Sequence, residues 1–294
     1  LHDLRPGDPA RVGLRQAVVT TDLAVRRRPR RGRRARRPPW FLLLPGLVAL
    51  VFLVVPMVGL VAQVPWDSFL ETITAPEAMT ALRLSLVTST LATCFAAVVG
   101  VPFAWLLARD VLPFTHVWRA LVLVPLLLPP VVSGVALLAA FGRFGLVGQY
   151  VYSWFGFQIP FTTLAVVLAM AFVAMPFLII TLEGAFRTLD RRYEDAAATL
   201  GASSWTTFRR VTLPLAGPSL LAGAVLCWAR ALGEFGATVT FAGSFPGTTQ
   251  TMPIAIYYAL DTNWSAAISL SVVLMGVCIA VLVALRGRYL RTSS

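Results

Sequence analysis

The sequence contains no lysine, because all 25 of its basic residues are arginine. A Walker A phosphate loop needs a Gly-Lys pair to cradle a nucleotide, so this absence excludes an ATPase of the usual kind. Histidine is nearly absent too, and the two that occur, His2 and His116, cannot build a multi-histidine metal site. The sequence therefore predicts no catalytic residue, no metal site and no cofactor.

Cysteine and charge are also scarce. The three cysteines, Cys94, Cys227 and Cys278, lack CxxC spacing and fall in apolar stretches, so we expect them to pack rather than form disulfides. Only 13% of the residues are charged and 57% are apolar, a balance that excludes a soluble domain. The chain is expected to be an integral membrane protein with several spans and not an enzyme.

Six stretches approach or exceed the roughly 20 apolar residues that a bilayer requires. They cover residues 41–62, 84–108, 120–140, 161–182, 216–241 and 265–285. Most arginines outside these stretches fall on one side of the predicted membrane, and only Arg83 and Arg143 fall on the other. Because arginine-rich loops stay in the cytoplasm, both termini are predicted to be cytoplasmic.

The N-terminal region carries a dense run of charge. Residues 26–37 hold nine arginines and no acid, a pattern that nucleic-acid-binding segments share. No aromatic residue interrupts the run and a predicted span follows it, so control of topology or contact with anionic membrane lipid is preferred, and no nucleic-acid partner is expected. The sequence thus divides into a disordered arginine-rich cytoplasmic tail, residues 1–39, and a transmembrane domain, residues 40–290.

A polar segment, residues 190–214, separates the fourth and fifth predicted spans. Acids lie in the first turns of its first predicted helix, where the helix dipole favours negative charge: Asp190, Glu194 and Asp195. Gly201 can supply the left-handed residue that ends this helix. Ser203 or Ser204 can cap a second helix, which is predicted to stop before Pro214. A helix–Gly–helix element between spans is typical of a docking surface on the cytoplasmic side.

The spacing of this segment resembles the signature of ATP-binding-cassette (ABC) importer permeases: Asp195-Ala-Ala, three residues, Gly201, nine residues, Val211-x-Leu-Pro. Asp replaces the usual Glu, and Val replaces the usual Ile. The resemblance implies that the segment seats in a cleft of a separate ATPase subunit. It also implies which residues couple the two proteins: Glu194, Asp195, Ala196, Ala197, Gly201, Leu213 and Pro214. A polar interfacial hairpin without a partner is the plain alternative.

Arg230 and Glu234 lie inside the fifth predicted span, four residues apart and hence on one helix face. Charges at that depth are costly and usually face a bundle interior or an aqueous cavity. Two interpretations stay open: an internal ion pair that fixes packing, or an arginine that attracts an anion in a translocation pathway. Pro129 and Pro130 in the third span permit a similar choice between irregular packing and a bent helix that lines the pathway.

Other motifs narrow the resemblance to the molybdate importer permeases: Ala229-Arg-Ala-Leu-Gly-Glu-Phe-Gly-Ala-Thr, Phe241-Ala-Gly-Ser-Phe-Pro-Gly-Thr-Thr-Gln-Thr-Met-Pro, and Leu126-Leu-Leu-Pro-Pro-Val-Val-Ser-Gly. The likeness covers about residues 80–286. Sulfate permeases share Ala-Arg-Ala-Leu-Gly-Glu but usually diverge in the other portions. The resemblance favours molybdate, with tungstate as a related substrate, over sulfate.

Together these features predict an all-α integral membrane protein with six transmembrane helices and a cytoplasmic helix–Gly–helix coupling loop between spans 4 and 5. The resemblance implies a bacterial inner-membrane permease that forms a homodimer. It also implies two cytoplasmic ABC ATPase subunits and an external oxyanion-binding protein as partners. An ion-coupled secondary carrier is the alternative from another class, although it would need more ionisable groups within the spans and no docking loop.

Overall fold

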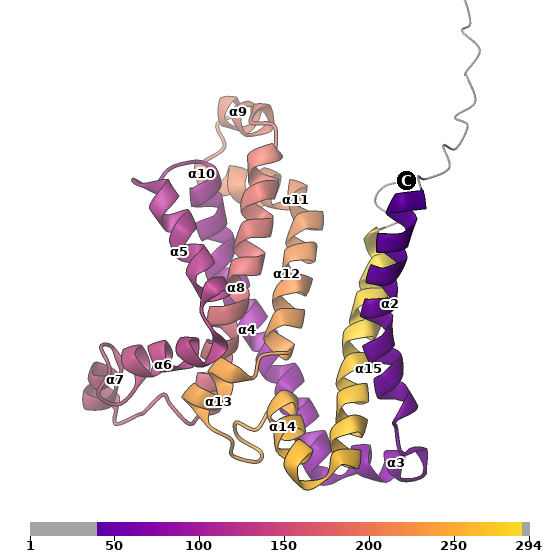
Figure 1. Cartoon of the computed structure of the whole chain (residues 1–294). Helices are drawn as coiled ribbons and strands as arrows, with labels where there is room; N and C mark the ends of the chain where they lie inside the picture. The colour runs from indigo at the N-terminus through magenta and orange to yellow at the C-terminus, as the bar shows by residue number, and fades with distance from the viewer. Residues whose placement is uncertain (1–39, 290–294) are drawn as a thin grey trace, which may run out of the picture. The chain divides into compact units, whose positions relative to one another are not determined.

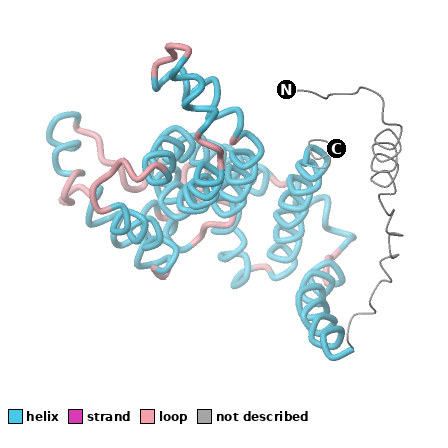
Figure 2. The backbone as a smooth tube through the Cα atoms, turned by 90° about the horizontal axis from the view of Figure 1, so that it is seen from above, coloured by secondary structure: helices cyan, strands magenta, loops and turns pink. Residues whose placement is uncertain are grey.

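The structure is a computed structural model that describes residues 40–289. This part of the chain is helical, with no strand among residues 40–289 (Figure 2). The chain divides into two units between Val55 and Pro56, inside the helix α2 (Trp40–Ala62). The predicted arginine-rich tail, residues 1–39, lies outside the described residues.

The second unit contains the remaining helices (Figure 1). They are α3 (Trp66–Thr74), α4 (Pro76–Ala108), α5 (Thr115–Leu127), α6 (Pro130–Phe141), α7 (Gly148–Phe155), α8 (Thr163–Thr188), α9 (Arg192–Thr199), α10 (Ser204–Thr207), the π-helical η1 (Phe208–Thr212), α11 (Leu213–Leu215), α12 (Gly217–Leu232), α13 (Gly236–Ala242), α14 (Met252–Thr262) and α15 (Trp264–Tyr289). In Figure 1, α9 lies at one end of this unit, and α3 and α14 lie at the other.

Four helices of the described chain, α2, α4, α8 and α15, are long and apolar enough to cross a membrane. The number rises to six if each of two bent helix pairs counts as one span, which matches the predicted number only under that counting. Small residues make close packing possible: Ala92, Ala96 and Ala104 of α4 are fully buried, as are Ala165 and Ala169 of α8. Helices with small residues on their contact faces can approach closely, and α8 packs against both α4 and α12.

The third predicted span is not one continuous helix. Residues 120–140 fall on α5 and α6, which bend by 117° at Leu128 and Pro129. Pro129 and Pro130 lack the N–H groups that would continue the helical hydrogen-bond ladder, and Pro130 begins the new helix instead. The double proline therefore produces a break between two half-helices.

The fifth predicted span, residues 216–241, is also interrupted. The helix α12 ends at Leu232, and α13 begins only at Gly236. A second bend, of 74°, separates residues 204–215 from α12. The prolines of the third span predict the break at Pro129 and Pro130, whereas the sequence pattern did not locate the break between Leu232 and Gly236, because hydropathy averages over windows that are longer than a break.

Candidate functional site

The 190–214 segment folds as a helix, a glycine turn and a second helix, as its sequence predicts. The acids Glu194 and Asp195 occupy the first turn of α9. Gly201 has a φ of +81°, and the N–H of Ala202 donates to the carbonyl of Ala197 at 3.0 Å, which closes the end of α9. The Ser203 hydroxyl accepts the N–H of Thr206 and so caps the second helix.

The prediction that the second helix stops before Pro214 is wrong. Helical backbone continues from Ser204 to Leu215, and Pro214 lies in the first turn of α11. The π-helical turn η1 makes this possible, because Leu213 donates to Phe208, five residues earlier, at the point where proline would disturb the ladder. The sequence rule that proline ends helices fails here because one wider turn accommodates the ring.

The side chains of this segment divide into an exposed set and an inward set. Asp195 and Ala196 are exposed, and Leu200 is 88% exposed although it is large and apolar. Tyr193 and Trp205 are also exposed, at 58% and 66%. Exposed apolar side chains around small residues form a surface on which another protein can pack closely. Ala197 and Leu213 are partly covered, and Pro214 is exposed.

Glu194 faces inward and not toward this exposed surface. Its Oε1 accepts a hydrogen bond from Arg109 Nη2 at 2.6 Å and one from the Thr212 hydroxyl at 2.8 Å. Arg109 caps the end of α4, and its side chain is only 8% exposed, whereas that of Glu194 is 21% exposed. Glu194 therefore joins α9 to η1 and to the long helix α4.

Aromatic contacts lie beside these polar bonds. Phe208 of η1 stacks on Trp205, meets Trp105 of α4 edge-on with ring centroids 5.9 Å apart, and lies 6.5 Å from the ring of Phe186 in α8. Edge-to-face and offset rings attract through their quadrupoles. The cluster therefore places the segment against the ends of α4 and α8.

Arg230 and Glu234 form a close ion pair, with Arg230 Nη1 2.7 Å from Glu234 Oε2. The other oxygen, Oε1, accepts the N–H of Ala237 at 2.9 Å, so Glu234 satisfies a donor in the first turn of α13. Glu234 is 1% exposed, and the side chain of Arg230 is 31% exposed. The carboxylate thus has a structural role across the break between α12 and α13, while the Arg230 side chain remains partly exposed.

The two half-helices that follow breaks pack against each other. A Cβ atom added to Gly236 would lie 2.6 Å from Cβ of Pro130, and one added to Gly134 would lie 3.0 Å from the carbonyl oxygen of Ala237. The structure therefore brings Pro130, and Pro129 before it, next to the helix that Glu234 caps. It does not bring the 190–214 segment there, because thirteen residues of helix rise about 20 Å between Gly217 and Arg230.

Sequence reasoning missed four polar residues of these regions. The sequence marks Arg109 only as an arginine at the end of a predicted span. It gives Thr212, between Val211 and Leu213, no feature that indicates a role. The hydroxyls of Ser133 and Thr238, on α6 and α13, are buried and have no hydrogen-bond partner among the described residues. Nothing in the sequence distinguishes them from the many hydroxyls in these helices that bond their own backbone.

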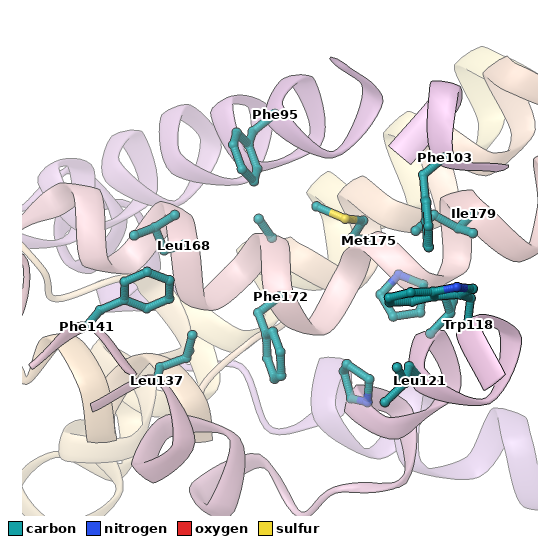
Figure 3. A pocket seen from close by; sticks show the side chains of 14 residues that line it. Phe95, Phe103, Trp118, Leu121, Leu137, Phe141, Leu168, Phe172, Met175 and Ile179 are labelled. Carbon is teal, nitrogen blue, oxygen red and sulfur yellow. The ribbon is translucent and has the colours of Figure 1, made fainter. Parts of the chain in front are cut away.

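A large cavity of about 420 Å³ lies elsewhere, between α4, α5, α6 and α8 (Figure 3). Apolar side chains line it, with Phe95, Phe172 and Met175 among those that point into it. No charged residue lines it. An oxyanion would lose its hydration there without gaining a polar partner, so this cavity does not fit a translocation pathway.

Residues 100–292 match the family model described as "Binding-protein-dependent transport system inner membrane component". The molybdenum transport system permease protein ModB of Mycobacterium tuberculosis is 47% identical over 250 residues, which cover 85% of this chain and 94% of that protein. ModB of Escherichia coli strain K12 is 43% identical over 190 residues, which cover 65% and 82% of the two chains.

Sulfate permeases match at lower identity. The sulfate transport system permease protein CysT of Escherichia coli strain K12 is 33% identical over 240 residues, with 80% of this chain and 86% of that protein covered. Among solved structures, a bacterial ABC transporter that imports the polysaccharide alginate superposes with a TM-score of 0.69 over 87% of this chain and 96% of that chain. Its sequence identity is 16%, so this likeness describes the fold.

Proposed function

We propose, from the premise that this chain belongs to the family of binding-protein-dependent transport system inner membrane components, that it is the permease subunit of an ABC importer of molybdate. The protein is not itself an enzyme, because the ATPase of such a system is a separate subunit and this sequence has no phosphate-binding lysine. The observation that carries the proposal is the 190–214 segment, whose exposed apolar and small residues surround a left-handed glycine.

Molybdate is proposed as the substrate because the molybdenum permeases match at higher identity than the sulfate permeases, and over as much of the chain. Molybdate, tungstate and sulfate are tetrahedral dianions, so a cationic group suits all three. Arg230, which is accessible beside a break in the helix, can offer that charge, and the buried Glu234 limits how strongly an anion is held. Discrimination between the anions is assigned to an external oxyanion-binding protein.

Two copies of the chain are proposed to form the pathway. The side chain of Arg230 is partly exposed, yet it lies thirteen residues along an apolar helix from Gly217. Lipid tails would not solvate this cation, whereas a second copy could enclose it in an aqueous passage. The half-helices that begin at Pro130 and Gly236 lie near this position, so Pro129 and Pro130 are proposed to line the pathway.

Each copy is proposed to receive one of two cytoplasmic ATPase subunits. Asp195, Ala196, Ala197 and Gly201 would seat in a cleft of the ATPase, because small side chains permit close approach and the glycine sets the angle between α9 and α10. Closure of the ATPase pair around ATP would then move the docked segments, and the two permease halves would reorient. The 190–214 segment and both termini are accordingly proposed to lie on the cytoplasmic side of a bacterial inner membrane.

The test is co-purification of the chain with its ATPase, comparing the wild type with Asp195→Arg. The substitution puts a bulky cation at an exposed position whose side chain makes no hydrogen bond or ion pair among the described residues, so the packing of the long helices should be unaffected. We expect an ATPase to co-elute with the wild type and to be lost, by at least tenfold, from the variant. If the ATPase binds both proteins equally, the segment is not the docking surface.

The substrate is tested by uptake of radioactive molybdate into vesicles that contain the whole complex. We expect excess tungstate to compete strongly and excess sulfate weakly. Uptake should require internal ATP and should persist when ionophores remove ion gradients. Uptake that follows the ion gradient and ignores ATP would favour the secondary carrier, and sulfate competition as strong as that of tungstate would favour the sulfate permease.

A further inference from the structure

Arg109 has no place in the docking surface, yet it is one of the most enclosed charges in the described chain. Its side chain is 8% exposed, and its Nη2 lies 2.6 Å from Glu194 Oε1. The Thr212 side chain, in a residue that is 1% exposed, donates to the same oxygen of Glu194. Three helical elements, α4, α9 and η1, therefore meet at one carboxylate oxygen. Burying a charge pair in this way costs desolvation free energy, so we expect this contact to have a role other than stability.

We propose that Arg109, Glu194 and Thr212 form a clamp that makes the 190–214 segment and α4 move as one body when the ATPase pulls on the segment. Arg109 is then a positioning residue of transport, acting through Glu194 and not through the ATPase. The inference rests on the proposed function. It also changes the expected role of Glu194, which would transmit motion from inside the permease rather than contact the ATPase.

The apolar contact between the segment and α4 is poorly suited to carry this motion alone. A pocket of about 290 Å³ is lined by Pro102, Trp105 and Leu106 of α4 on one side and by Ser204, Trp205 and Phe208 on the other, so the two surfaces meet at the rings of Trp105 and Phe208 but leave space beside them. Dispersion contacts weaken steeply across a gap, and the ring contact between the segment and α4 is one edge-on pair, Trp105 with Phe208. The charge-assisted hydrogen bond to Arg109 is short and directional, so it fixes the segment where the apolar seam leaves it loose.

The ion pairs of the described residues support this assignment. Arg119 joins Asp110 and Glu183, Arg187 joins Glu183 within α8, and Arg230 joins Glu234. Arg109 with Glu194 is the pair, among these described residues, that links the 190–214 segment to a long helix. The helix it reaches, α4, packs along α8 and α12, and α12 carries Arg230. A displacement of α9 would therefore pass through the clamp to the helix bundle that surrounds the proposed pathway.

The experiment uses the whole complex in proteoliposomes, with molybdate, the binding protein and the ATPase that co-purifies with the wild type. The variants are Arg109→Gln, Glu194→Gln and the double variant. The matched control is Arg187→Gln, which breaks a pair of the same chemistry that lies within one helix. Three quantities are measured: the amount of ATPase bound, the rate of ATP hydrolysis, and the molybdate imported per ATP hydrolysed.

We expect both single variants to bind the ATPase as the wild type does and to hydrolyse ATP, but to import at least tenfold less molybdate per ATP. The double variant should be no worse than the poorer single variant, because the two residues act as one unit. The Arg187→Gln control should import normally. Unchanged import per ATP in either single variant would overturn the clamp, and so would losses that multiply in the double variant.

A purely structural role is excluded by a further pair of outcomes. Exchanging the charges, with Arg109→Glu and Glu194→Arg together, should restore at least part of the import per ATP if the pair itself transmits motion. If instead Arg109→Gln releases the ATPase, or if a single variant fails to insert and the exchanged pair does not recover import, the clamp only shapes the segment. If the wild type binds no ATPase, the proposed function is contradicted. That result comes from the wild type alone, so it is distinguished from a failure of the clamp, which only the variants reveal.

Discussion

At the residue scale, the structure divides the two members of the intramembrane pair. Glu234 is buried and bonds both Arg230 and the backbone of α13, so the packing interpretation describes the carboxylate well. Arg230 keeps about a third of its side chain exposed, which leaves it free to meet an anion. The two interpretations drawn from the sequence are therefore compatible, because a buried carboxylate does not prevent its partly exposed partner from meeting an anion.

Arg230→Met and the double change with Glu234→Gln test this division. The single change leaves a buried carboxylate without its cation, and we expect it to destabilise the fold by about 3–5 kcal/mol. The double change should recover most of that stability, because glutamine can still accept the N–H of Ala237. Thermal unfolding of the detergent-solubilised protein measures both effects.

Uptake then decides the role of the arginine. If Arg230 attracts the oxyanion, the double variant should be stable and assembled but should import molybdate at least tenfold more slowly than the wild type. Recovery of import along with stability would restrict the pair to packing and remove Arg230 from the pathway.

At the element scale, the joint between α9 and α10 depends on one backbone conformation. Gly201 has a φ of +81°, and a Cβ atom added there would meet no atom within 4 Å. A larger side chain at this position is therefore disfavoured by the left-handed backbone conformation and not by contact with neighbouring atoms. The π-helical turn η1 serves the same joint from the other side, because it carries the helix past Pro214 and orients Thr212 toward Glu194.

Gly201→Val should therefore impose a conformational cost of about 1–2 kcal/mol on the joint while the long helices stay folded. If that cost is met only when the ATPase docks, binding weakens about 5- to 30-fold. Gly184→Val is the matched control, since a Cβ atom there is also unobstructed and the backbone of α8 is helical. Titration of the ATPase against each purified variant measures the difference in affinity. Equal affinities would show that the left-handed conformation of Gly201 does not set the docking geometry of the joint.

At the scale of the whole molecule, the proposed orientation assigns two exposed turns of the second unit to opposite faces of the membrane. The tip of α9 would face the cytoplasm, and the turn between α6 and α7 would face the exterior. Leu200 and Leu146 are 88% and 75% exposed at these places. Both can therefore carry a reactive cysteine without disturbing the packing.

The orientation is tested in a protein whose native cysteines are replaced by alanine. A membrane-impermeant thiol reagent should label Leu200→Cys only in inside-out vesicles and Leu146→Cys only in right-side-out vesicles. Val98→Cys, exposed on the long helix α4, is the control and should stay unlabelled because lipid covers it. Labelling of Leu200→Cys from outside would reverse the topology and remove the ATPase from this end.

The sequence by itself determined the class of the protein, its apolar segments and the helix–Gly–helix segment. These features are local: hydropathy acts within a window, and a left-handed glycine or a serine cap acts within one turn. The resemblance to ABC importer permeases rested on residues such as Asp195 and Gly201, and the family match confirmed it. The lack of lysine predicted that this chain has no Walker A phosphate loop, before any fold was known.

Only the tertiary structure decided which of the prolines separate two helices and which residues meet. Pro102 and Pro176 lie inside α4 and α8, whereas Pro129 and Pro130 lie at the break between α5 and α6. The bend at Pro129, the turn between Leu232 and Gly236, and the passage of a helix through Pro214 depend on packing that supplies the energy of an irregular backbone. The partnership of Arg109 with Glu194 joins residues 85 positions apart, which no local pattern contains. A hydrogen bond of that kind forms because α4 and α9 are brought together by burial elsewhere, so the fold, and not the spacing, selects the partner.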